Sequence, residues 1–269
     1  MTAPAPPPFI LSVSNRKGGS GKTTTVVNLA AEWAARGARV LVVDLDTQGH
    51  AGLGLGLATG RGEPTAHDLF RRPGFDLAAA ARPTAWPGLF CVPADPLFEG
   101  DGDRDPGQLA RQLRRPDLAA RIDVVILDTP PALDFILINA LAAADGVVIP
   151  LLPHALSAEG VRQLSRLFFR IASGANPALR LIGLLPVMLN PRVNHHQAIL
   201  AGLTRQFGPE RMLRGIRADI ALAEAFAAGH PARVHAPRSR GALDYHLLAE
   251  EVPRLWRRPL PVSAQEVPA

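Results

Sequence analysis

The sequence predicts an α/β protein with three layers, in which a mostly parallel, twisted sheet carries helices on both faces. Short apolar runs such as IDVVILD and GVVIPL alternate with segments of helical periodicity. Strands that are apolar on both faces are typical of parallel sheets covered by helices. The chain has 269 residues, 47% hydrophobic and 20% charged, which is the composition of a globular protein with a large core.

Apolar runs bounded by polar or turn-forming residues predict six strands. They span residues 9–14, 39–44, 89–93, 122–128, 146–151 and 181–189. Four helices are expected between and after them, over residues 22–36, 157–171, 195–207 and 243–252. In the first helix Val26, Leu29 and Trp33 recur on one face, and Gly37 follows as a termination signal.

Composition divides the chain into three parts. We expect residues 1–8, rich in Pro and Ala, to form a flexible leader. Residues 9–252 form the single expected domain, and residues 253–269 a disordered, proline-rich tail. Inside the domain, residues 58–121 are rich in Pro, Gly, Asp and Arg, which favours variable surface structure.

Composition also excludes several classes of protein. No run of about 18 uncharged apolar residues could span a membrane, and the first residues lack the features of a secretory signal. Cys91 is the only cysteine, which excludes a disulfide framework and an iron–sulfur cluster held by one chain. We therefore expect a reducing, cytoplasmic location and no membrane partner.

The basic residues are unevenly distributed in type and in place. Of 29 Lys and Arg residues only Lys17 and Lys22 are lysines, and both lie in one glycine-rich segment. Chemistry that needs a compact ammonium group explains these exceptions. Residues 1–159 hold 14 basic and 17 acidic residues, whereas residues 160–258 hold 15 basic and 6 acidic ones. A basic half of this kind favours a polyanionic partner.

A glycine-rich loop follows the first strand and opens the first helix. Its residues are Gly18, Gly19, Ser20, Gly21, Lys22, Thr23 and Thr24. The generic phosphate loop has another glycine where Arg16 stands, so this loop is a variant. Backbone amides and the helix N-terminus can hold phosphate oxygens, Lys22 can reach the β- and γ-phosphates, and the Thr23 hydroxyl can bind Mg²⁺. The loop predicts nucleotide binding.

Three motifs in order resemble those of the ParA/MinD family of deviant phosphate-loop (P-loop) ATPases: KGGSGKTTT, VVDLDTQGHA and VVILDTPP. The similarity runs from about Phe9 to Val252 and is closest to the ParA-type partition and positioning ATPases. The resemblance implies the fold of a deviant P-loop NTPase, with one ATPase domain over residues 9–252. It also implies hydrolysis of ATP to ADP and phosphate, with ATP and Mg²⁺ as cofactors.

The resemblance assigns catalytic roles to two residues. Lys17 is expected to reach the phosphates of a second subunit in an ATP-bound homodimer, where another cation would stabilise the transition state. Asp46 is expected to orient the attacking water. Asp128 ends an apolar strand, where a carboxylate can hold Mg²⁺ through water. Asp44 is expected to support the metal region, with a structural role at the strand end as the alternative.

A late asparagine completes the predicted nucleotide site. Family members bind the base with an asparagine after a late strand, and Asn190 stands in that position. The alternative role for Asn190 is to cap the turn that follows.

Arginines suggest a surface for nucleic acid. Three recur every fourth residue on one predicted helix and three follow later: Arg162, Arg166, Arg170, Arg205, Arg214 and Arg217. Arginines without a base-reading module predict sequence-independent, salt-sensitive contacts to phosphates. Partition ATPases often carry arginines where Ala218 and Ala221 stand. Either this chain uses different arginines for DNA, or its DNA binding is weakened.

These observations predict an ATP-dependent, dimerising ATPase of the ParA type. It would bind duplex DNA nonspecifically, associate with the nucleoid, and position a plasmid, a chromosome or a protein cluster. A cargo-associated partner protein would activate ATP hydrolysis. The alternative is a regulatory or metallochaperone-like ATPase of the same family that does not bind DNA.

Overall fold

The computed structural model describes residues 6–60, 62–132 and 134–256. Within these residues seven strands form one sheet in the order β3-β4-β2-β5-β1-β6-β7. The strands are β1 Phe9–Val13, β2 Val40–Asp44, β3 Arg82–Pro83, β4 Leu89–Val92, β5 Val124–Asp128, β6 Gly146–Leu151 and β7 Arg180–Pro186. The six predicted strands are confirmed with small shifts at their ends. All pair in parallel except the short edge strand β3, which pairs antiparallel with β4.

Helices connect the strands and follow the last of them. They are α1 Lys22–Ala34, α2 His50–Gly54, α3 Asp68–Arg71, α4 Gln108–Leu113, α5 Pro116–Ala119, α6 Phe135–Ala143, α7 Ala155–Ala172, α8 Asn194–Phe207, the 3₁₀ helix η1 Pro209–Arg211, α9 Ile220–Ala227, α10 Ala232–His235 and α11 Arg240–Trp256. The four predicted helices correspond to α1, α7, α8 and α11. Sequence periodicity missed the shorter ones and the mostly apolar α6.

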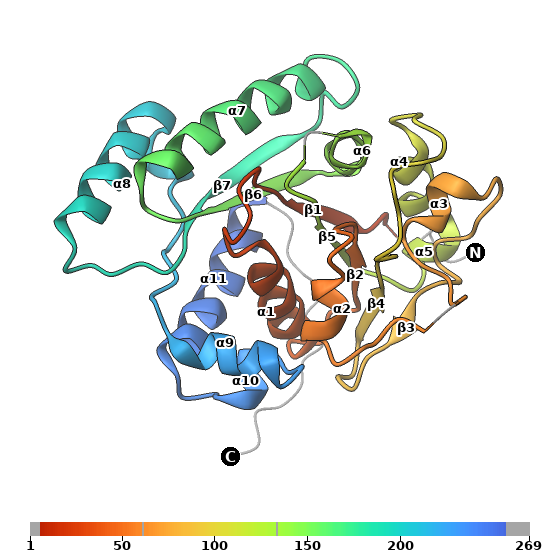
Figure 1. Cartoon of the computed structure of the whole chain (residues 1–269), viewed down its shortest axis with the longest axis horizontal. Coiled ribbons are helices and arrows are strands. Elements are labelled where there is room, and N and C mark those ends of the chain that lie inside the picture. Colours follow the sequence, from red (N-terminus) through yellow and green to blue (C-terminus); the bar gives the residue numbers. More distant parts are fainter. Residues whose placement is uncertain (1–5, 61, 133, 257–269) are drawn as a thin grey trace.

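The sheet has a hydrophobic core on each face, as the three-layer prediction requires. Ile10 and Leu41 point to the core beneath α4, α6 and α7, whereas Leu11 and Val42 point to the core beneath α1 and α11. Neighbouring residues of one strand therefore serve opposite layers, because successive side chains of a strand alternate between faces. Figure 1 shows α6, α7 and α8 on one side of the sheet and α1, α9 and α11 on the other.

Parallel pairing brings the carboxyl ends of three central strands together. Val13, the last residue of β1, pairs with Asp128, the last of β5. Asp44, the last of β2, also pairs with Asp128. The segments that leave these strands therefore share one edge of the sheet, which is where ligands bind in open α/β folds.

The segment over residues 58–121 is more ordered than its composition predicted. It contributes α3, β3, β4, α4 and α5, and its apolar side chains are part of the core. Phe70, Leu77, Leu109 and Leu113 are fully or almost fully buried. The prediction of surface structure was wrong for these residues, because a few well-spaced apolar residues among many prolines and glycines are sufficient to dock short helices.

Helix α11 ends later than the predicted residue 252. It continues through Pro253 to Trp256, although proline removes the N–H that would bond to the carbonyl of Ala249. That carbonyl instead accepts a hydrogen bond from Trp33 Nε1 at 2.9 Å. Trp256 is buried against Phe9, with ring centroids 3.7 Å apart. The rest of the predicted tail, residues 257–269, and residues 1–5 of the leader lie outside the described residues.

No helix within the described parts of the chain is long and apolar enough to cross a bilayer.

Candidate active site

The glycine-rich loop joins the end of β1 to the start of α1. Gly19 and Gly21 have φ angles of +69° and +81°, which favour glycine. A Cβ on Gly21 would lie 3.2 Å from Cγ2 of Val187, so the loop also packs tightly there. Helix α1 starts at Lys22 with no side-chain cap and no acidic residue in its first turn. Its free N–H groups and its dipole therefore suit an anion.

Lys22, Thr23 and Asp128 form the centre of the site. Lys22 is buried, with 5% of its surface exposed, and its positive charge acts on Asp128. The hydroxyl of Thr23 donates to Oδ2 of Asp128 over 2.7 Å. The end of β5 and the first turn of α1 are thus tied together directly beneath the loop.

Asp128 carries an unsatisfied oxygen. Its Oδ1 is buried and has no hydrogen-bond partner among the described residues. Burial raises the pKa of Asp128 to about 7, against the opposing effects of the Thr23 hydrogen bond and the Lys22 charge. A buried acceptor without a partner is unfavourable unless a ligand satisfies it. Because Mg²⁺ prefers carboxylate, hydroxyl and water oxygens, Thr23 and Asp128 fit a hydrated Mg²⁺ ion.

Both carboxylate oxygens of Asp44 accept hydrogen bonds from backbone N–H groups. Oδ2 accepts from the backbone N–H groups of Ala51, at 2.9 Å, and Gly52, at 3.3 Å. Oδ1 accepts from the N–H of Asp46 at 3.2 Å. Burial and the charge of Asp128 raise the pKa of Asp44 well above its ordinary value. Asp44 thus anchors the segment from β2 to α2, which is the structural alternative for this residue.

Asp46 lies two residues beyond β2, at the same edge. It is 9% exposed, and its Oδ1 accepts from the N–H of Gln48 at 3.1 Å. Its carbonyl accepts from the N–H of Gly49 at 2.9 Å. The turn fixes the Asp46 side chain at the carboxyl edge, close enough to Asp128 for its charge to raise the Asp128 pKa.

Lys17 contacts a residue that the sequence reasoning missed. Its backbone N–H donates to Oδ1 of Asn15 at 3.0 Å, and its Nζ lies 3.2 Å from Nε2 of His154, just before α7. Because an ammonium group only donates, Nε2 must be unprotonated. Burial and the charge of Lys17 lower the pKa of His154, which agrees with a neutral imidazole. No sequence signal pairs residues 137 positions apart.

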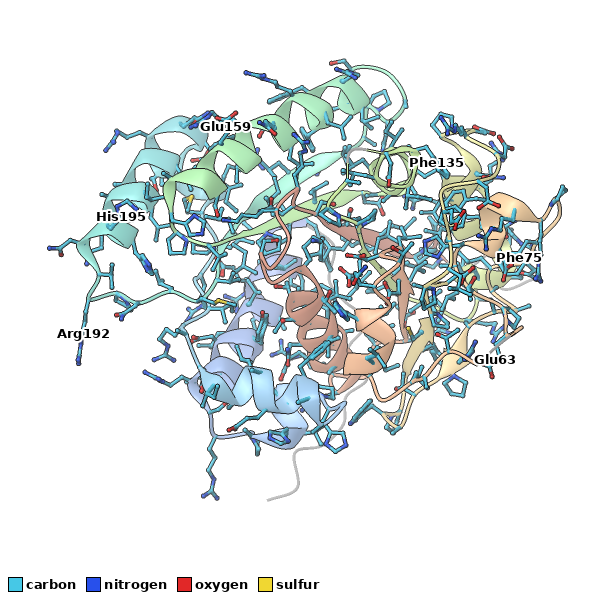
Figure 2. The ribbon with its side chains drawn as sticks, in the orientation of Figure 1. Glu63, Phe75, Phe135, Glu159, Arg192 and His195 are labelled. Atoms are coloured by element: carbon cyan, nitrogen blue, oxygen red, sulfur yellow. The ribbon has the colours of Figure 1, made fainter. Side chains whose placement is uncertain are left out.

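Asn190 caps the turn between β7 and α8. Its Oδ1 accepts from the N–H of Arg192 at 3.0 Å, and the Arg192 side chain extends away from the body of the molecule (Figure 2). Asn190 is exposed and lines a cavity of about 390 Å³ together with Arg217, Ala218 and Arg240. The capping alternative is therefore observed, and the base-binding role stays a prediction.

A second, more apolar cavity opens beside the loop itself. It measures about 290 Å³ and begins at Gly21 and Thr24. Val187, Leu222 and Tyr245 form part of its lining. The sequence reasoning missed this cavity because its walls come from the segment after β7, from α9 and from α11, which are far from the loop in sequence.

The six arginines predicted to contact DNA are in different environments. Arg162 pairs with Glu159 at 2.7 Å, both being exposed. Arg217 pairs with the buried Asp244 at 2.8 Å and also bonds to it through its backbone N–H. The remaining four are exposed and form no ion pair with any described carboxylate: Arg166, Arg170, Arg205 and Arg214. Two of the six therefore have competing partners inside the chain.

Comparisons with known proteins indicate the family to which the chain belongs. A family model described as an AAA domain matches residues 9–181. Chromosome-partitioning ATPase Soj of Thermus thermophilus is 40% identical over 242 residues, which cover 90% of this chain and 94% of the relative. Chromosome partitioning protein ParA of Myxococcus xanthus is 35% identical over 260 residues, which cover 94% of this chain and 90% of the relative.

A solved structure shares both fold and sequence. It is cobyrinic acid a,c-diamide synthase from Mycobacterium smegmatis with bound ADP and magnesium, at a TM-score of 0.78 and 29% identity. The match covers 96% of this chain and all of that one. Fold and site together define a P-loop nucleoside triphosphatase. Within that class, the chain belongs to the ParA/MinD family of ATPases.

Proposed function

We propose that the protein is a Mg²⁺-dependent, ATP-hydrolysing homodimer of the ParA type that binds duplex DNA nonspecifically and positions a cargo. The observation that carries its chemistry is the Thr23–Asp128 pair, with one buried carboxylate oxygen unpaired beneath a glycine loop and a helix N-terminus. The names of the partitioning relatives support the biological role.

Each residue of the loop contributes to holding the triphosphate of ATP. The amides of residues 18–24 donate to phosphate oxygens, and Lys22 places its charge on the β- and γ-phosphates. Thr23 and Asp128 hold the hydrated metal ion, which neutralises charge on the phosphates when bound. Asp44 keeps the β2–α2 segment in place rather than binding the metal itself.

Asp46 orients the attacking water. One of its oxygens is fixed by the Gln48 N–H, which leaves the other to accept from a water at the carboxyl edge. Changing Asp46 to Ala should lower single-turnover ATP hydrolysis by at least about a hundredfold, the usual effect of losing a positioned acid–base group. ATP affinity should stay within about threefold. Unchanged turnover would remove Asp46 from this role.

Lys17 acts after two subunits close on ATP. In the single chain its ammonium lies against His154, so closing requires that this contact be exchanged for phosphate oxygens of the partner subunit. The added cation then stabilises charge in the transition state. The neutral His154 accepts one charge-assisted hydrogen bond and forms no ion pair, so the ammonium gains an oppositely charged partner when it moves to phosphate oxygens.

The base binds in one of two cavities, the one at Asn190 or the one at Gly21. The prediction from sequence places it at Asn190, whereas the apolar cavity at Gly21 offers more area for stacking. The variants Asn190→Ala and Leu222→Arg each alter one of the two cavities. The affinity of each variant for ATP is compared with its affinity for inorganic triphosphate, which has no base. The variant that weakens only ATP identifies the base site. Equal effects on both ligands from either variant would contradict a base role for that cavity.

The proposed DNA binding follows from the exposed arginines. The test measures binding to a random-sequence duplex across a salt series, with ATP, with ADP and without nucleotide. ATP-dependent, length-dependent and salt-sensitive binding is expected. Absence of binding at low salt would refute it and favour the regulatory or metallochaperone-like alternative. That alternative gains support from the internal partners of Arg162 and Arg217 and from Ala218 and Ala221.

A cytoplasmic, nucleoid-associated location and an activating partner protein bound to the cargo complete the proposal. The location follows from the proposed DNA binding, and the partner protein from the similarity to partitioning ATPases. Adding candidate cargo proteins to an ATPase assay with DNA tests the second point directly.

A further inference from the structure

A cavity on the α7 side of the sheet is separate from the phosphate loop. It measures about 400 Å³, within the range of small-molecule sites. No residue from 17 to 24 lines it. Its lining is Arg16, Ile138, Gln163, Arg166, Leu167 and Arg170. Gln163, Arg166 and Arg170 lie on one side of α7 because residues three, four and seven apart share a helix face.

The charge of this cavity is not neutralised within the described chain. Arg16, Arg166 and Arg170 form no ion pair with any described carboxylate. Arg16 donates one hydrogen bond, from its guanidinium to Oε1 of Gln163. Its Nε is buried and has no partner among the described residues. Burying such a donor is unfavourable unless a ligand accepts from it.

An acidic residue on the same helix already has partners. Glu159, labelled in Figure 2, lies on α7 one turn before Gln163. It pairs with Arg162, accepts from Gln163, and is close enough to Arg166 for the two charges to interact. It therefore orients Gln163 toward Arg16 but does not line the cavity. Three guanidinium groups remain around one concave space.

We propose that this cavity is a second anion site, which takes a compact polyphosphate such as the diphosphate or triphosphate group of a nucleotide. Guanidinium groups bind phosphate oxygens through paired, charge-assisted hydrogen bonds. Three of them exceed what a single carboxylate can accept. Ile138 and Leu167 add apolar wall, which suits the organic part of a nucleotide.

The site is connected to the ATPase machinery through one residue. Arg16 directly precedes Lys17, and its bond to Gln163 fixes the chain at the entrance of the phosphate loop. An anion that draws the Arg16 guanidinium away from Gln163 would shift the backbone that carries Lys17. The inference goes beyond the proposed function, because it needs neither hydrolysis nor DNA.

Direct binding of pyrophosphate in Mg²⁺-free buffer tests the site. Calorimetry at fixed ionic strength compares the Lys22→Ala chain, whose phosphate loop is disabled, with the same chain carrying Arg166→Ala and Arg170→Ala. The double change should weaken binding by at least about tenfold, as expected for losing charge-assisted hydrogen bonds. The matched control is Arg162→Ala, one turn away on α7 but outside the cavity, which should change affinity by less than about threefold.

Three results would overturn the proposal. One is equal pyrophosphate affinity with and without Arg166 and Arg170. Another is an equal loss from Arg162→Ala, which would indicate general attraction to a basic helix. The third is full displacement of pyrophosphate by a random-sequence duplex whose own binding is weakened equally by loss of Arg162, Arg166 or Arg170. That result would indicate that this face binds DNA. Melting temperatures verify that each variant folds.

Discussion

The carboxyl edge of the sheet and the arginine-bearing surface differ in how their residues are held. At the edge, Thr23 and Asp128 meet at 2.7 Å in a buried site, and one oxygen is left for a ligand. On the surface, Arg162 and Arg217 are held by Glu159 and Asp244. The edge residues leave one buried acceptor unsatisfied within the described chain, whereas two of the surface arginines already have ion-pair partners.

The difference shows where sequence motifs are reliable. Parallel strands bring their ends together whatever the intervening loops contain, so residues at strand ends share an edge. Whether an exposed arginine is available depends on acidic residues elsewhere, such as Asp244, which is 27 positions from Arg217. Composition alone does not contain that information.

The largest expected effect is a difference in ATP affinity between variants of the two loop lysines. Lys22→Ala should weaken ATP binding by at least about a hundredfold, because it removes the buried cation of the phosphate site. Lys17→Ala should change affinity by less than about threefold, since the Lys17 ammonium lies at His154 in the single chain. Fluorescent-nucleotide titration measures both. Similar losses for the two variants would contradict the separation of roles.

A second prediction concerns the buried charge at the edge. The pKa of Asp128 is raised to about 7 by burial, so between about pH 4 and 7 the folded state holds a proton that the unfolded state has lost. Its stabilising contribution is complete below about pH 4 and is lost as pH rises through 7. Without Mg²⁺ and nucleotide, Asp128→Asn should therefore raise the melting temperature at pH 8 by at least about 2–4 °C.

The control for Asp128→Asn is the same comparison at pH 4, where the wild-type carboxyl is largely protonated. The two melting temperatures should converge there. A constant difference at both pH values would show that the substitution acts through packing rather than through charge.

A smaller difference, in melting temperature, is expected between variants of the two arginines that form ion pairs. Arg217→Ala should lower the melting temperature measurably, because it leaves the buried carboxylate of Asp244 with only the backbone N–H of residue 217. Arg162→Ala should change it by less than about 2 °C, since both partners of the Arg162–Glu159 pair are exposed. Equal shifts in calorimetric scans would contradict the distinction between them.

Much of the fold was predictable from the sequence, for a physical reason. A central parallel strand is buried on both faces, so its apolar run stands out, as in residues 122–128. The short helices α3 and α4 were not predictable in the same way, because two or three apolar residues each dock them on the core. Helix α6 was missed since an apolar helix buried on most sides lacks an amphipathic pattern.

The candidate site likewise contains residues that the sequence could predict and residues that it could not. The loop, Asp46 and Asp128 could be proposed from the sequence because they lie next to strands in sequence. His154 and the apolar cavity at Gly21 were not, because each depends on contacts between distant segments. The sequence left two roles open for Asp44, support of the metal region and a structural role at the strand end. Its hydrogen bonds from Ala51 and Gly52 favour the structural role.

A crystal structure of the full chain with Mg²⁺ and a nonhydrolysable ATP analogue would decide whether the carboxyl edge is the ATPase centre. We expect the triphosphate on the amides of residues 18–24 and on Lys22, with Thr23 and Asp128 at the metal. In a closed pair of subunits, Lys17 should have left His154 for the partner's phosphates. An analogue bound elsewhere, or a closed pair with Lys17 still at His154, would contradict this.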